Sequence, residues 1–536
     1  MLSKLFNDSG VKYLIKNNKY VLLCILLFKF LLERLKKNKV SYNQNEDQVE
    51  VLFDKLPDII NLTIKPNSES QYKIEIVGHK LLLTKEIFEY NFSDQESLFS
   101  IYRFRWLLIG IEYYRDEGFV YQSIKVINHW IDNFDVIGKR VNETYSICER
   151  LLNILYFVSL VKHNNVKLYN KLNIQNLEKV FASQILDILE NIEDNGKQTN
   201  NHILNNIRAL YILGRLLEIK FISDLSHKLL LIHLKNHIKD GILNEGSFHY
   251  QILLTRTILE IYNTAQLTND NNMINCIEQT ANQMLFVTRS LHSDFSDTYP
   301  LIGDISPDFP VDFFQGYPFS KSDKNSKWNN LFNIRIENIE KHNVNNKYKY
   351  WEKFKFDDIE IWIVKKELGL LAHGHNDNSS FHIFFKGNAI THDIGRFTYN
   401  RNTMYDFMTQ QSFHNGINRD IDLDKTSILF NHFRKKSSVN IKTLTNGIVV
   451  HIVDCFAKNE YFYKILIDNN KVSILSDENI SLFLTDVKNI QNNSINMGEI
   501  EILLECDILY IKDNLASFNY RELTNVVEIE GISNVH

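Results

Sequence analysis

The sequence is poor in cysteine and proline. Its 536 residues include 5 Cys and 6 Pro, and the cysteines are scattered, odd in number and without the spacing of metal ligands. This pattern excludes a disulfide framework, and we expect reduced, buried thiols. Asn, Ile and Lys are abundant, so Asn-x-Ser/Thr matches such as 142–144 are only weak indications of glycosylation.

The chain also lacks a strong charge of either sign. The formal net charge is −5 and the pI is about 6.4. Such a balance gives no overall attraction to nucleic acid, and we expect no nucleic-acid partner. An anionic substrate would need a local basic groove.

A long hydrophobic run is missing as well. The apolar stretch at 20–32 is short for a transmembrane span, contains Lys29 and is followed by no small-residue cleavage site. We therefore expect an amphipathic helix rather than a signal peptide. It packs on the protein or lies on a membrane surface, with residues 12–36 as the candidate for peripheral membrane contact. Localisation stays open between the bacterial cell envelope or periplasm and the cytoplasm.

Helical periodicity dominates the first half of the chain. Hydrophobic residues make up 44% and charged residues 23%, typical of a globular protein, and 536 residues indicate two domains. Short polar connections favour antiparallel helical hairpins, and no fixed-length repeat indicates a solenoid. Apolar residues at three- and four-residue spacing predict helices over 97–116, 119–134, 144–163, 167–191, 201–219, 222–239, 248–265 and 270–291.

Strand patterns follow from about residue 348. The aromatic stretch at 293–324 has no periodicity and reads as an ordered loop or domain junction. Many strands without helices between them indicate an antiparallel sandwich. The expected domains are 1–41, an amphipathic and basic segment, then 42–340, helical, and 341–536, β. Strands are predicted at 359–364, 381–385, 448–453, 463–467, 480–484 and 500–511, with shorter β-like pieces at 62–64 and 72–76.

The stretch 368–393 is the richest in possible ligands. His373, His375 and Asp377 stand at alternate positions, and on a strand they would project from one face. Asp393 and His414 follow. Imidazole and carboxylate groups are the usual zinc ligands. The alternative is a set of polar residues in a loop.

Two places in the helical half can likewise be interpreted either as structural or as functional. Asn201 and His202 begin a predicted helix, either as solvated first-turn residues or as donors near a bound anion. Tyr250 shares a helical stripe with Leu254 and Ile258, which indicates a core tyrosine unless it faces a site. In the β half, Arg396, Tyr399, Arg401 and Tyr405 are either sheet-edge residues or groups that hold an acidic sugar.

Six elements in order resemble the heparinase II/III-like and alginate-lyase-like polysaccharide lyases. The resemblance extends along most of the chain, and each element alone is weak. They are Asn201-His202, the Asp240-Gly241…Glu245-x-Ser247-x-x-Tyr250 segment, PLIGD ending at Asp304, HGHND from His373, Asp393-x-Gly395, and His414-Asn415.

The resemblance implies an incomplete (α/α) toroid followed by an antiparallel β-sandwich, with the active cleft between them. It also implies β-elimination of a uronic-acid-containing polysaccharide. By position in the motifs, Asn201 would neutralise the uronate carboxylate with help from His202, Tyr250 would be the acid/base, His373 would lie beside it, and Tyr405 matches a second tyrosine. A structural zinc ion would be held by His375, Asp393 and His414.

The chemistry of β-elimination is consistent with these residue types. Removing the C5 proton of a uronate adds charge to a group that is already negative, so donors must face the carboxylate. Tyrosine has a pKa of about 10 and needs nearby positive charge to act as a base. The candidates for binding and polarising groups in this groove are His373, Arg396, Tyr399, Arg401, Arg150, Arg208 and Glu245.

The sequence departs from the family pattern at two positions, and two other functions are also compatible with it. Gln251 stands where relatives often have histidine, and Ile394 replaces a frequent proline. A glycoside hydrolase would need two paired carboxylates, for which Glu245 and Asp304 are candidates. A non-catalytic protein of glycan binding or envelope assembly would use the same scaffold. The glycan, its sulfation or acetylation, endo or exo action and the oligomeric state do not follow from the sequence.

Overall fold

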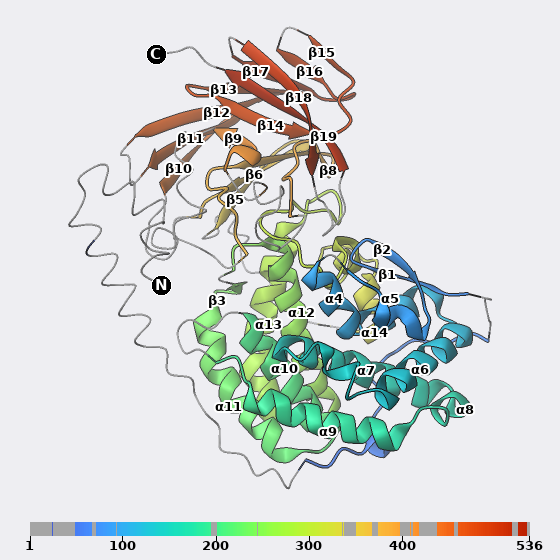
Figure 1. The fold of residues 1–536 in the computed structure, drawn as a ribbon. Helices are drawn as coiled ribbons and strands as arrows, with labels where there is room; N and C mark the ends of the chain where they lie inside the picture. The colour runs from blue at the N-terminus through green and yellow to red at the C-terminus, as the bar shows by residue number, and fades with distance from the viewer. Residues whose placement is uncertain are drawn as a thin grey trace.

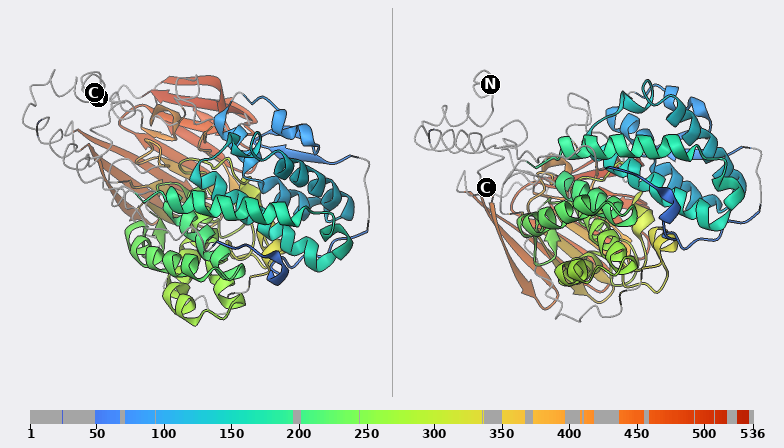
Figure 2. Two further views of the ribbon diagram at one scale, coloured as in Figure 1. Left: turned by 60° about the horizontal axis from the view of Figure 1, so that its bottom comes forward. Right: turned by 90° about the horizontal axis from the view of Figure 1, so that it is seen from below.

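The computed structural model describes residue 24 and residues 49–66, 71–92, 94–194, 201–243, 245–334, 336, 350–366, 373–396, 408, 411–417, 437–454, 459–491, 493–506, 508–516 and 524–532. Apart from Cys24, the predicted N-terminal segment 1–41 lies outside these residues, and so does the predicted boundary near 340. The helical and strand halves lie against one another in every view (Figures 1 and 2).

The helices of the described residues precede the main sheets. Helix α10 packs against α7, α11 and α12, and α12 packs against α13. The helices are α4 Gln95–Tyr102, α5 Arg105–Tyr114, α6 Glu117–Asp132, α7 Thr144–Asn164, α8 Val166–Tyr169, α9 Ile174–Glu190, α10 Asn201–Leu216, α11 Lys220–His237, α12 Phe248–Leu267, α13 Asn271–Leu291 and α14 Lys327–Phe332.

Two of the predicted helices are interrupted. The helix predicted over 97–116 is α4 and α5, because Phe104 between them has φ 56°, a left-handed conformation that cannot continue a helix. The helix predicted over 167–191 is α8 and α9, separated by the turn at 170–173. The other six predicted helices agree with the structure to within about two residues at most ends.

The strands form three larger sheets and two short hairpins. The strands are β1 Lys73–Ile76, β2 His79–Leu82, β3 Ile238–Lys239, β4 Ile242–Leu243, β5 Trp351–Phe356, β6 Ile359–Val364, β7 Phe381–Phe385, β8 Asn388–Ala389, β9 Gly416–Ile417, β10 Ser437–Leu444, β11 Gly447–Asp454, β12 Glu460–Asp468, β13 Lys471–Ser476, β14 Ile480–Leu484, β15 Asn489–Gln491, β16 Ser494–Asn496, β17 Glu501–Glu505, β18 Ile508–Ala516 and β19 Thr524–Ile532.

The direction of strand pairing differs at one place from a purely antiparallel arrangement. The larger sheets have the orders β10-β11-β12-β13-β17-β16-β15, β18-β19-β14-β9 and β5-β6-β7-β8. Most pairs are antiparallel, as predicted, but β13 and β17 pair in parallel. The single strand predicted over 500–511 is β17 and β18, and 62–64 forms no strand.

The sheet β5-β6-β7-β8 joins the two halves because both of its faces are buried. On β6, Trp362 and Val364 belong to the hydrophobic core of the helical half. Ile361 and Ile363 belong to the core of the strand half. Side chains that alternate along a strand point to opposite faces, so β6 lies between the two cores.

Polar contacts fix the junction stretch against the same sheet. Lys353 on β5 donates to the carbonyl of His292 at 2.9 Å and pairs with Glu360 on β6 at 2.8 Å. The backbone N–H of Asp294 donates to Glu360 at 2.8 Å, and Ser296 donates to the carbonyl of Gly387 at 2.8 Å. The two halves are therefore tied together directly after α13.

A buried charge cluster lies inside the helical half. It consists of Arg103, Arg105, Arg208, Arg256, Glu149, Glu260 and Asp308, all of them buried. Glu149 lies 3.1 Å from Arg105, 2.7 Å from Arg208 and 3.2 Å from Arg256. Burial alone would raise the pKa of Glu149, but the three guanidinium groups hold it well below its ordinary value.

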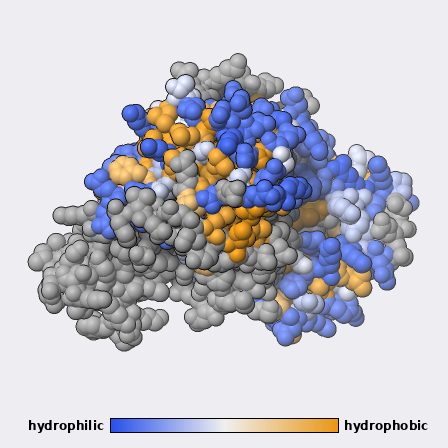
Figure 3. Space-filling view, turned by 90° about the horizontal axis from the view of Figure 1, so that it is seen from above, coloured by the Kyte–Doolittle hydropathy of each residue, from blue (hydrophilic) through white to orange (hydrophobic). Residues whose placement is uncertain are grey.

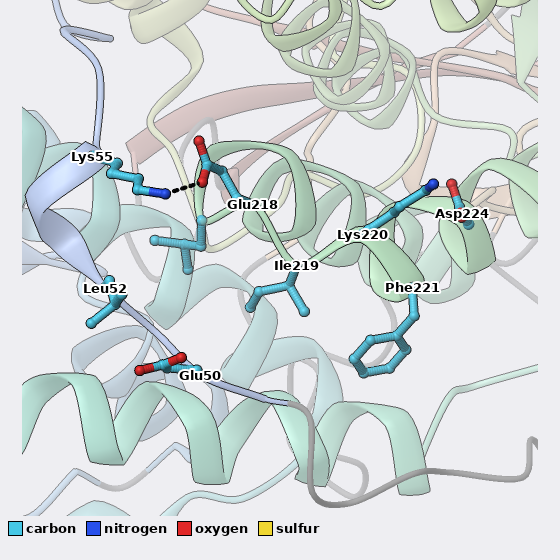
Figure 4. Close-up of a pocket in the computed structure, with 9 residues that line it drawn as sticks. Glu50, Leu52, Lys55, Glu218, Ile219, Lys220, Phe221 and Asp224 are labelled. Atoms are coloured by element: carbon cyan, nitrogen blue, oxygen red, sulfur yellow. Dashed lines mark hydrogen bonds and ion pairs between the residues drawn. The ribbon is translucent and has the colours of Figure 1, made fainter.

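We expect Glu149→Gln to lower the free energy of unfolding by about 3–5 kcal/mol, because three buried arginines lose their shared counter-charge. Urea unfolding at pH 7 measures this change. The matched control is Glu218→Gln, whose ion pair with Lys55 lies at the edge of a surface pocket (Figure 4) and is more than half exposed on both sides. The control should leave the midpoint unchanged. An equal shift of the unfolding midpoint in both variants would contradict this role of Glu149.

Seen from above, the described surface is mainly hydrophilic, with hydrophobic residues gathered toward the middle of the view (Figure 3). The four described cysteines are free thiols. Only Cys148 is buried as predicted, whereas Cys276 and Cys506 are partly buried and Cys24 is exposed. Among the described helices, none has the length and apolar composition that crossing a bilayer needs.

Candidate active site

Tyr250 and His373 stack face to face. Their ring centroids are 3.5 Å apart and their planes differ by 9°. Tyr250 lies in the first turn of α12, where the Ser247 hydroxyl accepts its backbone N–H and caps the helix. His373 comes from the loop before β7, so the stack joins the helical half to the strand half.

The prediction that His373–Asp377 forms a strand is wrong. These residues form turns and bends, because their backbone groups bond to two other segments instead of a sheet. The N–H of His373 donates to the carbonyl of Glu245 at 3.0 Å, and its carbonyl accepts from the N–H of Asp304 at 2.8 Å. Asp377 pairs with Lys366 at 2.7 Å. Asp377 therefore does not join the two histidines.

Gly303 allows the three segments to meet. Its φ is +80°, and a Cβ atom there would lie 2.6 Å from the carbonyl oxygen of Gly246 and 2.7 Å from that of His373. Both the left-handed backbone and the lack of space require glycine. The following residue, Asp304, is thereby held next to both histidines of the loop.

Asp304 is a site residue that the sequence reasoning treated only as a motif position and a hydrolase candidate. Its carboxylate lies 3.2 Å from His373 Nδ1 and 2.8 Å from His375 Nε2. Arg396 lies 3.6 Å away. Burial would raise the pKa of Asp304, but Arg396 and the two histidine hydrogen bonds hold it well below its ordinary value. Asp304 is thus an anion that orients both imidazoles.

Asn201 lies beside His373 from the helical side. It is the first residue of α10, and its backbone N–H donates to the Glu245 carboxylate at 3.1 Å. Its side-chain Nδ2 lies 3.5 Å from His373 Nε2. The amide is buried, and its Oδ1 has no hydrogen-bond partner. With a proton on His373 Nδ1 toward Asp304, Nε2 accepts from Asn201.

Glu245 helps to hold Asn201 in this position. It is buried, and burial raises the pKa of its carboxyl above the ordinary value. One oxygen accepts the first N–H of α10, which is a group without an intrahelical partner. The sequence predicts that Glu245 contacts the substrate. In the structure, Glu245 instead positions the start of α10.

His202 faces more solvent than Asn201. Its side chain is 34% exposed, its ring lies 4.8 Å from that of Tyr145, and its Nδ1 lies 2.8 Å from Glu193. Burial lowers the pKa of His202, but the hydrogen bond and charge of Glu193 outweigh burial and raise it.

The sign of this shift gives a pH prediction. Because the folded pKa of His202 is raised, its pair with Glu193 stabilises the fold fully below the unfolded value of about 6.5 and loses this contribution as pH rises through the folded pKa. Glu193→Gln should lower the His202 pKa in an NMR titration of the ring protons. An unchanged pKa in the variant would refute the pairing.

A possible metal triad lies on the other side of Asp304. One ligand atom each of His375, Asp393 and His414 lies within 4.8 Å of the others, and all three residues are buried. His375 Nδ1 and His414 Nε2 have no hydrogen-bond partner. Burial lowers the pKa of His375 and so favours the neutral ring that binds metals. The donor set and its orphaned nitrogens fit a cation.

Arg150 and Arg208 have structural surroundings. Arg150 is fully buried, donates to Gln184 at 3.0 Å and to the carbonyl of Val141 at 3.2 Å, and lies over the Trp130 ring. Arg208 belongs to the buried charge cluster. Neither guanidinium reaches a surface, so we leave both out of the proposed substrate site.

The β-half candidates are only partly described. Arg396 contacts Asp304, whereas Tyr399, Arg401 and Tyr405 lie outside the described residues. Gln251, the departure next to Tyr250, bonds the N–H of Leu243 at 2.7 Å and the carbonyl of Gly241 at 2.9 Å. It therefore holds the β3–β4 hairpin.

Comparison with protein-family models gives no match, and neither does comparison with curated proteins. Solved structures do match. A heparinase III has a TM-score of 0.54 and 13% identity, over 99% of this chain and 90% of that chain. A second heparinase III has a TM-score of 0.50 and 12% identity, over 98% and 88%.

The heparan sulfate lyase HepC of Pedobacter heparinus is 15% identical over 87% of this chain and 79% of its own, with a TM-score of 0.47 that is too low to establish the fold. At these identities the likeness shows the fold alone. The chain therefore shares the mixed helix-and-sheet fold of the heparinase III structures, and the resemblance to heparinase II/III-like lyases is confirmed at that level.

Proposed function

We propose that this chain is a polysaccharide lyase that cleaves a uronic-acid-containing glycan by β-elimination. The observation that carries the proposal is the meeting of Asn201, Tyr250 and His373 from three separate segments. An amide donor, a phenol and an imidazole can supply the charge stabilisation and the proton transfer of an elimination next to a carboxylate. The proposed architecture is an incomplete (α/α) toroid, residues 42–340, followed by an antiparallel β-sandwich, residues 341–536.

In the proposed reaction Asn201 binds the uronate carboxylate. Abstraction of the C5 proton moves charge onto that carboxylate, and the Asn201 amide stabilises the charge without adding a negative group of its own. His202 assists from the next position of α10, where its raised pKa keeps positive charge available. The helix N-terminus adds a partial positive charge.

Tyr250 is the proposed acid/base. The phenolate takes the C5 proton, the electrons of the C5–H bond form the C4–C5 double bond, and the C4–O4 bond breaks. The proton then passes from the phenol to O4 of the leaving chain, so the reaction balances without another reactant. Tyr405 is the proposed second tyrosine, and Tyr399 and Arg401 are proposed to hold the acidic sugar.

His373 is proposed to orient and polarise Tyr250. Its ring covers one face of the phenol at 3.5 Å, and Asp304 fixes its rotation through Nδ1. Arg396, beside Asp304, brings positive charge to the same place. Positive charge near a phenol lowers its pKa and favours the base form.

We further propose that the ion at the triad is zinc, held by His375, Asp393 and His414. When bound, zinc would cross-link the loop before β7 to the segments after β8 and before β9, and no reaction step passes through it. Elemental analysis should find about one zinc per chain. His375→Ala should lose the metal and lower the melting temperature, whereas His451→Ala, at a partly exposed histidine of β11, should change neither. A wild-type protein that has no metal and normal stability would refute this site.

The function is tested by incubating the purified protein with heparosan, heparan sulfate, alginate, hyaluronan and bacterial capsule polysaccharides. Elimination creates a C4–C5 double bond conjugated to the carboxylate, which absorbs in the near ultraviolet. We expect absorbance to rise with at least one uronate glycan. Binding without any rise would favour a non-catalytic glycan-binding protein, and cleavage without a rise would favour a hydrolase.

A further inference from the structure

Asp304 is the common partner of the candidate active site and the metal triad. Its Oδ2 lies 3.2 Å from Nδ1 of His373, and its Oδ1 lies 2.8 Å from Nε2 of His375. Asp304 is 4% exposed, and its carbonyl accepts the hydroxyl of Ser247, the cap of α12, at 2.6 Å. A single buried carboxylate therefore lies between the imidazole that stacks on Tyr250 and an imidazole of the triad.

His375 has one ring nitrogen left for a cation. Nε2 is bonded to Asp304, whereas Nδ1 is buried, has no hydrogen-bond partner and lies 4.0 Å from Oδ1 of Asp393. A neutral imidazole carries one proton, so a cation bound at Nδ1 leaves this proton on Nε2. His375 then donates to Asp304, which is the usual arrangement of a metal-binding histidine and an outer carboxylate.

Without a cation, the proton of His375 has two positions. When it is on Nδ1, it lies on the side of Asp393, and the lone pair of Nε2 faces Oδ1 of Asp304 at 2.8 Å. Two acceptors at this distance repel one another. An empty triad thus permits two arrangements of the Asp304 carboxylate, whereas a filled triad permits one.

The arrangement with a cation also fixes His373. While Oδ1 of Asp304 accepts from His375, Oδ2 accepts the proton on Nδ1 of His373. Arg396, 3.6 Å from Oδ1, favours the same ionised carboxylate. Nε2 of His373 then presents a lone pair to the amide of Asn201 at 3.5 Å. The triad and the candidate active site therefore share one chain of hydrogen bonds.

We propose that Asp304 couples the metal triad to the candidate active site, so that a cation at Nδ1 of His375 keeps the proton of His373 on Nδ1. The importance of this coupling for catalysis rests on the proposed function, in which His373 acts on Tyr250. Asp304 is a positioning residue for both sites. Because coupling between two sites is reciprocal, a change at Asp304 also weakens cation binding.

Asp304→Asn tests the triad side of the coupling. Asparagine keeps the shape of aspartate but removes its charge and replaces one acceptor oxygen with a donor. In competition with a chromophoric chelator, we expect zinc to bind this variant about 10–100-fold more weakly than the wild-type protein. The matched control is Asp116→Asn, at a buried aspartate that accepts from the Tyr72 hydroxyl and the Phe119 N–H at 2.8 Å each, and its zinc affinity should be unchanged.

A second measurement uses the wild-type protein and so does not depend on the folding of Asp304→Asn. ¹⁵N NMR of histidine-labelled protein at fixed pH, with and without equimolar zinc, reports which ring nitrogen carries the proton. The His373 signals are identified by their absence in His373→Gln. We expect zinc to move the Nδ1 signal of His373 toward the protonated position, although His373 is not a ligand, and we expect no such move in Asp304→Asn.

The outcomes separate the coupling from the proposed function. Equal zinc affinities of Asp304→Asn and the wild-type protein, or wild-type His373 signals that zinc leaves unchanged, would overturn the coupling. A protein that shows both effects but cleaves no glycan would overturn the lyase function and keep the coupling. A lyase that binds no zinc would keep the function and overturn the coupling.

Discussion

Replacing Tyr250 with phenylalanine should lower kcat for elimination by about 10²–10⁴. The change removes the hydroxyl that transfers the proton and keeps the ring that stacks on His373 at 3.5 Å. Tyr250 is 7% exposed, so the ring itself contributes to the core of α12. Loss of one hydroxyl should change stability by only about 1 kcal/mol. Initial rates of near-ultraviolet absorbance and a thermal melt measure the two effects.

The control for this prediction is Tyr262→Phe on the same helix. Tyr262 is also buried, and its hydroxyl donates to Glu278 at 3.2 Å, at the other end of α12 from Tyr250. The loss of this hydroxyl should leave kcat unchanged. Near-full activity of Tyr250→Phe, or an equal loss in both variants, would remove Tyr250 from the mechanism.

Asn201→Asp should have the second large effect, a loss of about 10²–10³ in kcat. The two side chains have the same shape, but aspartate places a negative charge where the uronate carboxylate gains charge in the transition state. The contact of Nδ2 with His373 is lost as well. Because the effect is larger in the transition state than in the bound substrate, kcat should fall more than KM rises.

The matched control for Asn201→Asp is Asn271→Asp. Asn271 is likewise the first residue of a helix, α13, and is exposed. An acidic residue is favourable at a helix N-terminus, so this variant should keep full activity and stability. If Asn201→Asp raised KM without lowering kcat, Asn201 would serve binding alone.

Much of the fold follows from local periodicity. Helices α6, α7 and α13 and strands β6, β7 and β14 lie where apolar spacing predicts them, because one buried face repeats along each element. The break between α4 and α5 was not predicted, since Phe104 gives no sign of a left-handed conformation. The parallel pairing of β13 with β17 depends on contacts distant in sequence, which periodicity does not report.

In the candidate site, too, some features follow from the sequence and others depend on the three-dimensional arrangement. The sequence motifs placed Asn201, Tyr250 and His373 in one group, and the structure brings them together. The sequence pattern could not show which of the candidate side chains are buried or which partners they bind. Arg150 and Asp377 looked available for ligands, yet each is committed to a buried partner. Asp304, whose role depends on Gly303 bringing two loops into contact, required the three-dimensional arrangement.

The central claim is that the glycan is cut by loss of a proton and a leaving group, not by addition of water. Mass spectrometry of the products formed in ¹⁸O-labelled water tests it most directly. The account predicts that the two new products together have the mass of the parent chain and that neither carries ¹⁸O. A pair of products heavier than the parent by one labelled water would contradict elimination and establish hydrolysis.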